Sequence, residues 1–127
     1  MKSKFEDLKA WQEAHKLTLM IYKATEDFPK GEEFGLKSQI RRSSASVAAN
    51  LVEGSSRSSR KEYKQFAYQA RGSLEETKYH LLLARDLKYI TFSQYEKIME
   101  QVNTVGRLVN GLIKYLRTNT QDPRPNL

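Results

Sequence analysis

Apolar residues in the last third of the chain recur at alternating intervals of three and four positions, which strongly limits the folds available to it. The members of this seam are Tyr95, Ile98, Val102, Val105, Val109, Leu112 and Leu116. Because an α-helix completes a turn in about 3.6 residues, this spacing places them all on one side of a helix and indicates that this side is buried. No segment shows the alternation typical of a strand, so the chain is predicted to be all-α.

Similar spacings and turn residues predict four helices in total, with approximate bounds of 6–28, 33–53, 60–88 and 94–118. Pro29 and Gly31 separate the first helix from the second, and Gly54 is expected to end the second as a left-handed residue. Joined by short connections, helices of this length predict an antiparallel, up-down-up-down four-helix bundle. Residues 1–119 form one domain in this interpretation, and 120–127 form a flexible tail.

Two sequence patterns indicate where the last two helices begin. A serine followed three positions later by a glutamate is typical of a helix start, because each side chain can bond the other residue's backbone N–H. Ser59 and Glu62 form this pattern, and so do Ser93 and Glu96. Ser59 and Ser93 are therefore predicted to cap the third and fourth helices.

The charge balance suggests which partners suit the chain. It has 22 Lys and Arg against 15 Asp and Glu, a formal net charge of +7. This surplus favours polyanions such as RNA or DNA. The absence of cysteine excludes disulfides and Cys-based zinc sites. No apolar run approaches the roughly 18 residues of a membrane span, so we expect a cytoplasmic protein without a membrane partner.

The segment from Lys37 to Lys64 contains seven cations and only the acidic residues Glu53 and Glu62. Phosphate contacts from such a segment would bind nucleic acid with little sequence specificity. The residues expected to bind are Arg57, Arg60, Lys61 and Lys64, with Arg41 and Arg42 second. Solubilising charges at one end of a bundle are the alternative interpretation.

Small residues cover the back of the second predicted helix, where a water-exposed helix would normally carry Lys and Glu. The third predicted helix is also apolar on the side opposite its core seam. Since a helix with two apolar sides needs two partners, we expect a second copy of the chain to cover these surfaces. The predicted interface residues are Ala45, Ala49, Tyr68, Gly72 and Tyr79.

Four further polar residues are expected to have structural roles: Asn50, Glu53, Arg71 and Glu75. Asn50 and Glu53 can make local hydrogen bonds near the end of their helix, or join a network with Arg42 or Arg71. Arg71 and Glu75 lie one helical turn apart. Such networks fix the register of a bundle, because an unpaired buried charge is costly.

No catalytic or metal site is expected. A di-iron site in a four-helix bundle uses a Glu-x-x-His motif on each of two helices. The histidines of this chain are His15 and His80; Glu76 precedes His80 by four positions, and Gln12 stands three positions before His15. His15 lies on an apolar seam and is predicted to be a hydrogen-bonded core residue. Neither a phosphate-binding glycine loop nor a hydrolase motif is present, so no cofactor is expected.

Several short motifs, taken together, resemble a known family. They are FEDLKAWQEA, FPKGEEFGLKSQIRR, NLVEG followed by Arg57, EYKQF and ARGSLEE. In this order they are similar to the four-helix bundle proteins encoded in 23S rRNA intervening sequences, over nearly all of residues 4–116. Leu51 and Val52 stand where isoleucine and alanine are common in that family.

The resemblance implies an antiparallel four-helix bundle that assembles as a ring-like homopentamer with a basic surface. The family is also similar in fold to the accessory variability protein of diversity-generating retroelements, which binds nucleic acid and a reverse transcriptase. The resemblance thus implies self-association, RNA or DNA, and a nucleic-acid-processing protein as partners. We expect a non-catalytic nucleic-acid-binding oligomer; a protein-interaction scaffold with no nucleic-acid role is the alternative.

Overall fold

The computed structural model describes residues 4–118, and this part of the chain is entirely helical, without a strand. In chain order its elements are η1 (Lys4–Asp7), α1 (Lys9–Ala24), η2 (Lys30–Glu32), α2 (Leu36–Ser55), α3 (Arg60–Asp86) and α4 (Phe92–Arg117). These four α-helices are consistent with the predicted bundle. The predicted tail at 120–127 lies outside the described residues.

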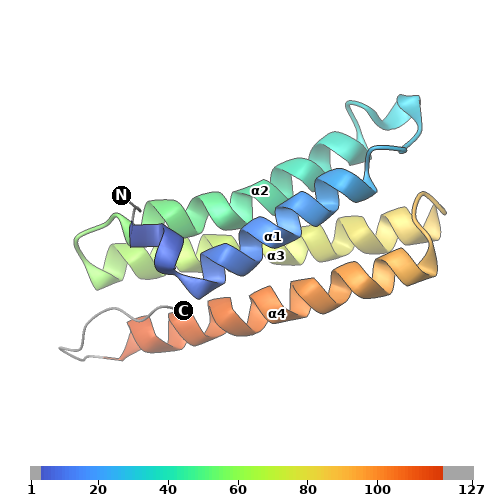
Figure 1. Cartoon of the computed structure of the whole chain (residues 1–127). Helices are drawn as coiled ribbons and strands as arrows, with labels where there is room; N and C mark the ends of the chain where they lie inside the picture. Colours follow the sequence, from blue (N-terminus) through green and yellow to red (C-terminus); the bar gives the residue numbers. More distant parts are fainter. Residues whose placement is uncertain (1–3, 119–127) are drawn as a thin grey trace.

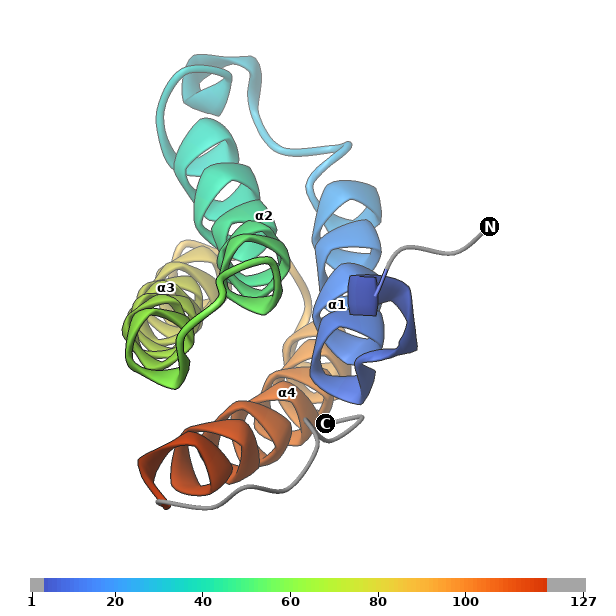
Figure 2. The ribbon, with the colours of Figure 1, turned by 90° about the vertical axis from the view of Figure 1, so that its left-hand side faces the viewer.

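The α-helices pack in a cycle around a shared core. Helix α1 contacts α2 and α4, and α3 contacts the same two neighbours. Figure 2 looks toward one end of the molecule and shows the helices arranged around this core. In Figure 1 the chain runs the length of the molecule along each helix and turns back at its end. The α2–α3 turn and the end of α4 therefore lie at the same end of the molecule.

The predicted apolar seam of α4 forms one wall of the core. Six of its members are buried, and the seventh, Tyr95, is half-buried. Leu17 of α1, Val47 of α2 and Leu81 of α3 supply fully buried side chains from the other helices. Burial of apolar surface on this scale is the main favourable contribution to folding.

One of the predicted helix starts is confirmed and the other is wrong. Helix α3 begins after Ser59, whose Oγ accepts a hydrogen bond from the Glu62 backbone N–H at 3.1 Å. Helix α4 begins earlier than predicted, after Thr91 rather than Ser93. Thr91 Oγ1 accepts from the Gln94 N–H at 3.0 Å, and Gln94 Oε1 accepts from the Thr91 N–H at 2.8 Å. The two residues thus form a reciprocal capping box.

Gly54 does not end α2 as a left-handed residue. The helix continues through it to Ser55, and none of the described glycines has a positive φ. Gly54 is buried against α3. The helix ends at Ser55 and is capped by Ser56, whose backbone N–H bonds the Glu53 and Gly54 carbonyls. Gly54 is therefore required for close helix packing rather than for a turn.

Part of the small-residue surface of α2 is covered by α3 of the same chain. Ser43 and Thr77 are fully buried, and their hydroxyls lie 2.8 Å apart. The hydroxyls of Ser46 and Ser73 meet at 2.9 Å one turn further along. The sequence alone suggests that another subunit covers these serines. In the structure they pack against α3 of the same chain instead.

The predicted interface residues lie further round the two helices. Ala45 and Tyr68 are half-buried, whereas Ala49, Gly72 and Tyr79 are exposed. A Cβ atom at Gly72 would meet nothing within 4 Å, which shows how open this surface is. Exposed small and aromatic side chains thus remain on the outside of α2 and of α3.

Glu32 links the α1–α2 connection to the α3–α4 turn, at the end of the molecule opposite the α2–α3 turn. Its Oε1 accepts from the Leu36 backbone N–H at 3.0 Å, and its Oε2 accepts from the Tyr89 hydroxyl at 2.8 Å. The bond from the Leu36 N–H, followed by that from Tyr89, lowers the pKa of Glu32. The same carboxylate raises the pKa of Tyr89. Glu32 thereby supplies a hydrogen-bond acceptor for the first backbone N–H of α2 and connects the start of this helix to the α3–α4 turn.

None of the helices between residues 4 and 118 has the length and apolar character needed to cross a membrane.

Candidate nucleic-acid interface

Arg60, predicted to contact phosphate, is bound to the end of α4. Its Nη2 donates to the Tyr115 carbonyl at 2.6 Å and to the Thr118 carbonyl at 3.3 Å. Its guanidinium also lies 4.4 Å from the centroid of the Tyr115 ring. The last carbonyls of a helix lack backbone partners and carry partial negative charge, so a cation is stabilising there. Arg60 therefore closes the bundle end rather than projecting from it.

Arg57 is also engaged within the chain. Its Nη2 lies 2.9 Å from Glu53 Oε2, and its guanidinium lies 4.8 Å from the centroid of the Phe66 ring. Glu53 thus makes a local ion pair at the end of α2, and this pair reduces the positive charge that Arg57 offers to a ligand. Arg57 is half-buried and Glu53 is exposed, so the pair contributes little to stability.

Lys61 and Lys64, near the start of α3, make no ion pair with the described residues. Lys61 is exposed, and Lys64 is half-buried. Lys64 lies on α3 between Arg60 and Tyr68, and both of these residues contact the last turn of α4. The lysines are therefore beside the end of α4 rather than isolated on a loop.

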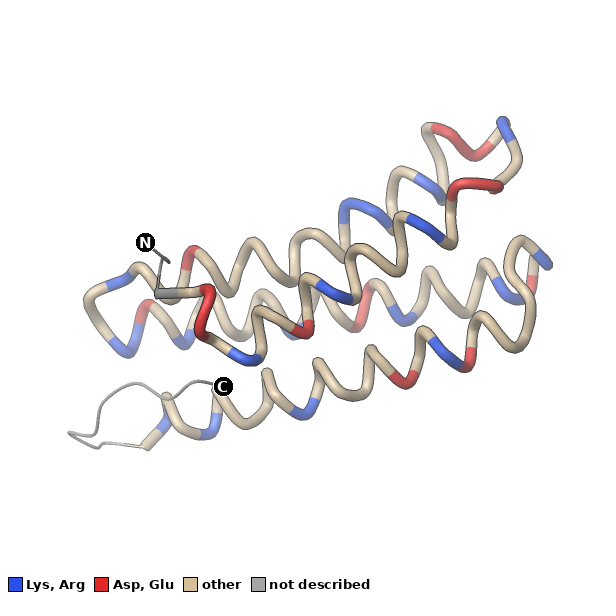
Figure 3. The backbone as a smooth tube through the Cα atoms, viewed as in Figure 1, with Lys and Arg blue, Asp and Glu red and all other residues tan. Residues whose placement is uncertain are grey.

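The end of α4 adds two cations to this surface. Arg117 Nε donates to the Tyr68 hydroxyl at 2.8 Å, while Lys114 is exposed and makes no ion pair with residues 4–118. Figure 3 shows basic segments of the α2–α3 turn and of α4 at the same end of the molecule. We name Lys61, Lys64, Lys114 and Arg117 the basic end.

Arg41 and Arg42 do not belong to the basic end. They lie near the start of α2, about 20 Å along that helix from its other end. Arg41 Nε donates to Thr25 Oγ1 at 2.8 Å, and Arg41 Nη2 donates to the Tyr22 carbonyl at 3.0 Å, which closes the end of α1. Arg42 pairs with Glu76 at 2.6 Å. The cations that lie close in the sequence are thus divided between opposite ends of the bundle.

The remaining residues predicted to have structural roles make separate contacts and do not form one shared network. Asn50 Nδ2 donates to the Ser46 carbonyl at 2.9 Å, and Glu75 lies 3.4 Å from Lys78 Nζ. Arg71 Nη1 donates to Asn110 Oδ1 at 3.2 Å, across the α3–α4 contact. Asn50 therefore bonds within α2, whereas Arg71 links α3 to α4.

The described residues hold no group of three or more His, Asp or Glu side chains placed to bind a metal. His80 Nε2 lies 3.2 Å from Glu76 Oε2, which also pairs with Arg42. His15 is exposed and stacks on Trp11, with ring centroids 5.1 Å apart, so the prediction that it lies in the core is wrong. Trp11, on the same predicted seam, thus covers one face of the His15 ring.

Comparison with known proteins shows the family of the chain. Residues 6–111 match the family model of the 23S rRNA-intervening sequence protein. The chain belongs to this family. A solved structure from Bacteroides thetaiotaomicron, a protein of unknown function from the S23 ribosomal protein family, is 29% identical with a TM-score of 0.74. The match covers 83% of this chain and 98% of that one. No curated protein matches the sequence.

In this member of the 23S rRNA-intervening sequence protein family, the sequence alone did not reveal Lys114 and Arg117 as part of the candidate interface. They lie about 50 residues beyond the basic segment of the sequence. Their spacing of three residues in the last turn of a helix was the available signal. Without the packing of α4 on α3, nothing connected that signal to Lys61 and Lys64.

Proposed function

We propose that this family member is a non-catalytic, homo-oligomeric, cytoplasmic protein that binds RNA or DNA through phosphate contacts with little sequence specificity. The observation that carries the proposal is the basic end: Lys61, Lys64 and Lys114 make no ion pair with residues 4–118. Unpaired ammonium groups on neighbouring helices suit a chain of phosphates, whose binding releases counterions.

An antiparallel bundle that assembles as a ring-like homopentamer would strengthen this binding. Each subunit would contribute a copy of the basic end, and linked copies bind a long polyanion far more tightly than one copy does. Ala49, Gly72 and Tyr79 are exposed and available for contact between subunits. The resemblance to accessory variability proteins supports a nucleic-acid-processing enzyme, such as a reverse transcriptase, as a further partner.

The test is a gel-retardation series with RNA and with duplex DNA, from about 50 to about 200 mM salt. The test variant is Lys61→Glu/Lys64→Glu, and the matched control is Lys16→Glu/Lys23→Glu on α1. All four are lysines without an ion pair within residues 4–118. Arg60 is left intact because its substitution would disturb the end of α4. We expect the test variant alone to lose retardation.

Absence of retardation by the wild-type protein at low salt would overturn the proposed function. Equal retardation by the two double variants would overturn the assignment to the basic end.

A protein-interaction scaffold is the second candidate, favoured by exposed apolar side chains. Phe34 is 93% exposed, and Phe92 is 63% exposed. Large exposed apolar patches mark protein interaction sites. A Phe34→Ser/Phe92→Ser variant that retards nucleic acid normally but loses a protein partner captured by the wild type would favour this role.

A further inference from the structure

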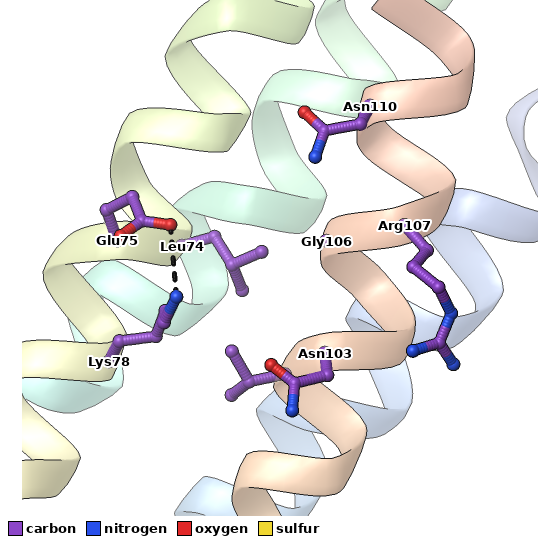
Figure 4. Close-up of a pocket in the computed structure, with 8 residues that line it drawn as sticks. Leu74, Glu75, Lys78, Asn103, Gly106, Arg107 and Asn110 are labelled. Carbon is purple, nitrogen blue, oxygen red and sulfur yellow. Dashed lines mark hydrogen bonds and ion pairs between the residues drawn. The ribbon is translucent and has the colours of Figure 1, made fainter.

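A hollow of about 310 Å³ lies between α3 and α4. Leu74 and Val102 supply its apolar lining, and Asn103, Asn110 and Lys78 supply polar groups around it. Figure 4 shows the Asn110 amide and the Glu75–Lys78 pair on the two sides of the gap, with Arg107 directed away from α3. Sites for small ligands occupy about 300–1,000 Å³, so the hollow is large enough for one planar group.

Gly106 keeps this hollow open. A Cβ atom at Gly106 would lie 3.6 Å from Leu74 Cδ2, an ordinary van der Waals distance. Packing of α4 on α3 therefore does not require glycine at this position, although glycine is a poor helix former. The space in front of Gly106 is instead available to a ligand, because no side chain fills it.

Cations line the same groove on both helices. Arg71 is held by Asn110 and lies 5.1 Å from the centroid of the Tyr68 ring. Arg117 is held by the hydroxyl of the same tyrosine. Tyr68 thus orients two guanidinium groups, one from each helix, and orientation before binding reduces the entropy lost when a ligand binds.

We infer that single-stranded nucleic acid follows this α3–α4 groove and places one unstacked base in the hollow at Gly106, an inference that rests on the proposed function. The phosphates contact Arg71 in the groove, and Lys64, Lys114 and Arg117 where the groove meets the basic end. The distance from Lys64 to Lys78 along α3 is about 21 Å, enough for a few nucleotides.

The lining of the hollow suits a nucleobase. Leu74 and Val102, which are 2% and 1% exposed, form the floor beneath it. The Asn103 amide offers a donor and an acceptor to its edge, and Asn110 offers its Nδ2 donor, because Asn110 Oδ1 accepts from Arg71. Glu75 accepts from an exocyclic amine, and its pairing with Lys78 limits its repulsion of phosphate. A base within a duplex is stacked and paired, so it cannot enter. The groove therefore selects single strands.

The experiment measures fluorescence anisotropy with a labelled oligonucleotide of about 12 nucleotides and with its duplex. Single strands of RNA and of DNA are both used. The test variant is Gly106→Gln, whose uncharged side chain fills the hollow. The control is Gly111→Gln on the same helix, where a Cβ atom meets nothing within 4 Å. Gly106→Ala is a second, smaller change that the 3.6 Å distance tolerates.

We expect Gly106→Gln to weaken single-strand binding on the order of tenfold, the effect of losing one bound base. Its salt dependence should equal that of the wild type, because no charge is removed. Gly106→Ala should weaken single-strand binding less, Gly111→Gln should match the wild type, and duplex binding should be unchanged in every variant.

A second pair of variants separates the phosphate contacts from the base. Lys64→Gln/Lys114→Gln should make the negative slope of log affinity against log salt shallower, by roughly 0.7 for each lost single-strand contact. Lys16→Gln/Lys23→Gln on α1 should leave that slope unchanged.

Equal single-strand affinity of Gly106→Gln and Gly111→Gln would overturn the inference. So would a Gly106→Gln variant that loses duplex binding as much as it loses single-strand binding. In both cases salt-dependent binding by the wild type would leave the proposed function standing. Absence of any binding at low salt would remove both.

Discussion

A Cβ atom on Gly54 would lie 2.9 Å from Cδ1 of Tyr63, closer than any side chain can approach without displacing its neighbour. The same atom would lie 2.9 Å from Phe66 Cβ. Tyr63 is buried, so it has little room to move. The closing turn of α2 therefore lies directly against the first turns of α3, and this contact positions Lys61 and Lys64 beside the end of α4.

Gly54→Ala should destabilise the protein by about 1–3 kcal/mol, the usual cost of overpacking a core. The better helix propensity of alanine offsets at most about 1 kcal/mol of this. Urea unfolding followed by circular dichroism measures the change. The matched control is Gly111→Ala, where the new methyl group meets nothing within 4 Å and should be neutral or stabilising. A Gly54→Ala variant as stable as this control would contradict close packing at Tyr63.

Arg60→Gln should destabilise the protein by about 1–2 kcal/mol, because the last carbonyls of α4 lose a charged donor. Lys61→Gln removes the same charge from the next residue and should leave stability unchanged within about 0.5 kcal/mol. Thermal unfolding of both variants distinguishes the two roles. The interpretation of Arg60 as the residue that closes α4 would be wrong if the two unfolding temperatures were equal.

The Glu32–Tyr89 contact should make stability depend on pH at both extremes. The pKa of Glu32 is lowered in the folded protein, so its contribution is present above the ordinary value of 4.5 and is lost as the pH falls through the folded pKa. The pKa of Tyr89 is raised, so its contribution is present below the ordinary value of 10.0 and is lost as the pH rises through the folded pKa.

Urea unfolding across a pH series tests this contact. Glu32→Gln should flatten the acid limb relative to the wild type, and Tyr89→Phe should flatten the alkaline limb. Glu33→Gln is the matched acid control, since Glu33 is exposed and pairs only locally with Lys37. Unchanged acid and alkaline limbs in the first two variants would show that the contact does not form in solution.

The helices could be predicted from the sequence because apolar periodicity records the buried side directly. Their ends were harder to predict, because alternative caps compete within a few residues. Thr91 with Gln94 and Ser93 with Glu96 are both acceptable capping pairs, and the structure forms the first. Gly54 presents the same difficulty, because a glycine near a helix end can serve a turn or a close contact.

The candidate site was harder to predict, since charge in a sequence does not show what each cation contacts. Arg41 and Arg60 bind the carbonyls that end α1 and α4, and these carbonyls come from distant segments of the chain. Arg42 meets Glu76, which is 34 residues away. Lys61 and Lys64 were predicted from the sequence and remain unpaired among residues 4–118. Lys114 and Arg117, their neighbours on α4, could be assigned to the same surface only from the fold.

Ala49→Glu should break the proposed homo-oligomer while leaving the subunit folded. Ala49 is exposed on the outside of α2, so a charged side chain meets water in an isolated subunit and should change its stability by no more than about 0.5 kcal/mol. Against another subunit the same carboxylate would be desolvated without a partner, which is strongly unfavourable. Lys16→Glu on α1 is the control for a new surface carboxylate.

Light scattering at micromolar concentration should give a multiple of the subunit mass for the wild type and for Lys16→Glu, and a single subunit mass for Ala49→Glu. Circular dichroism should show equal helix content in all three proteins. A wild-type protein that is monomeric under these conditions would contradict self-association. An Ala49→Glu variant that keeps the wild-type mass would instead show that the interface does not include the surface of α2 around Ala49, because an unpaired carboxylate could not be accommodated there.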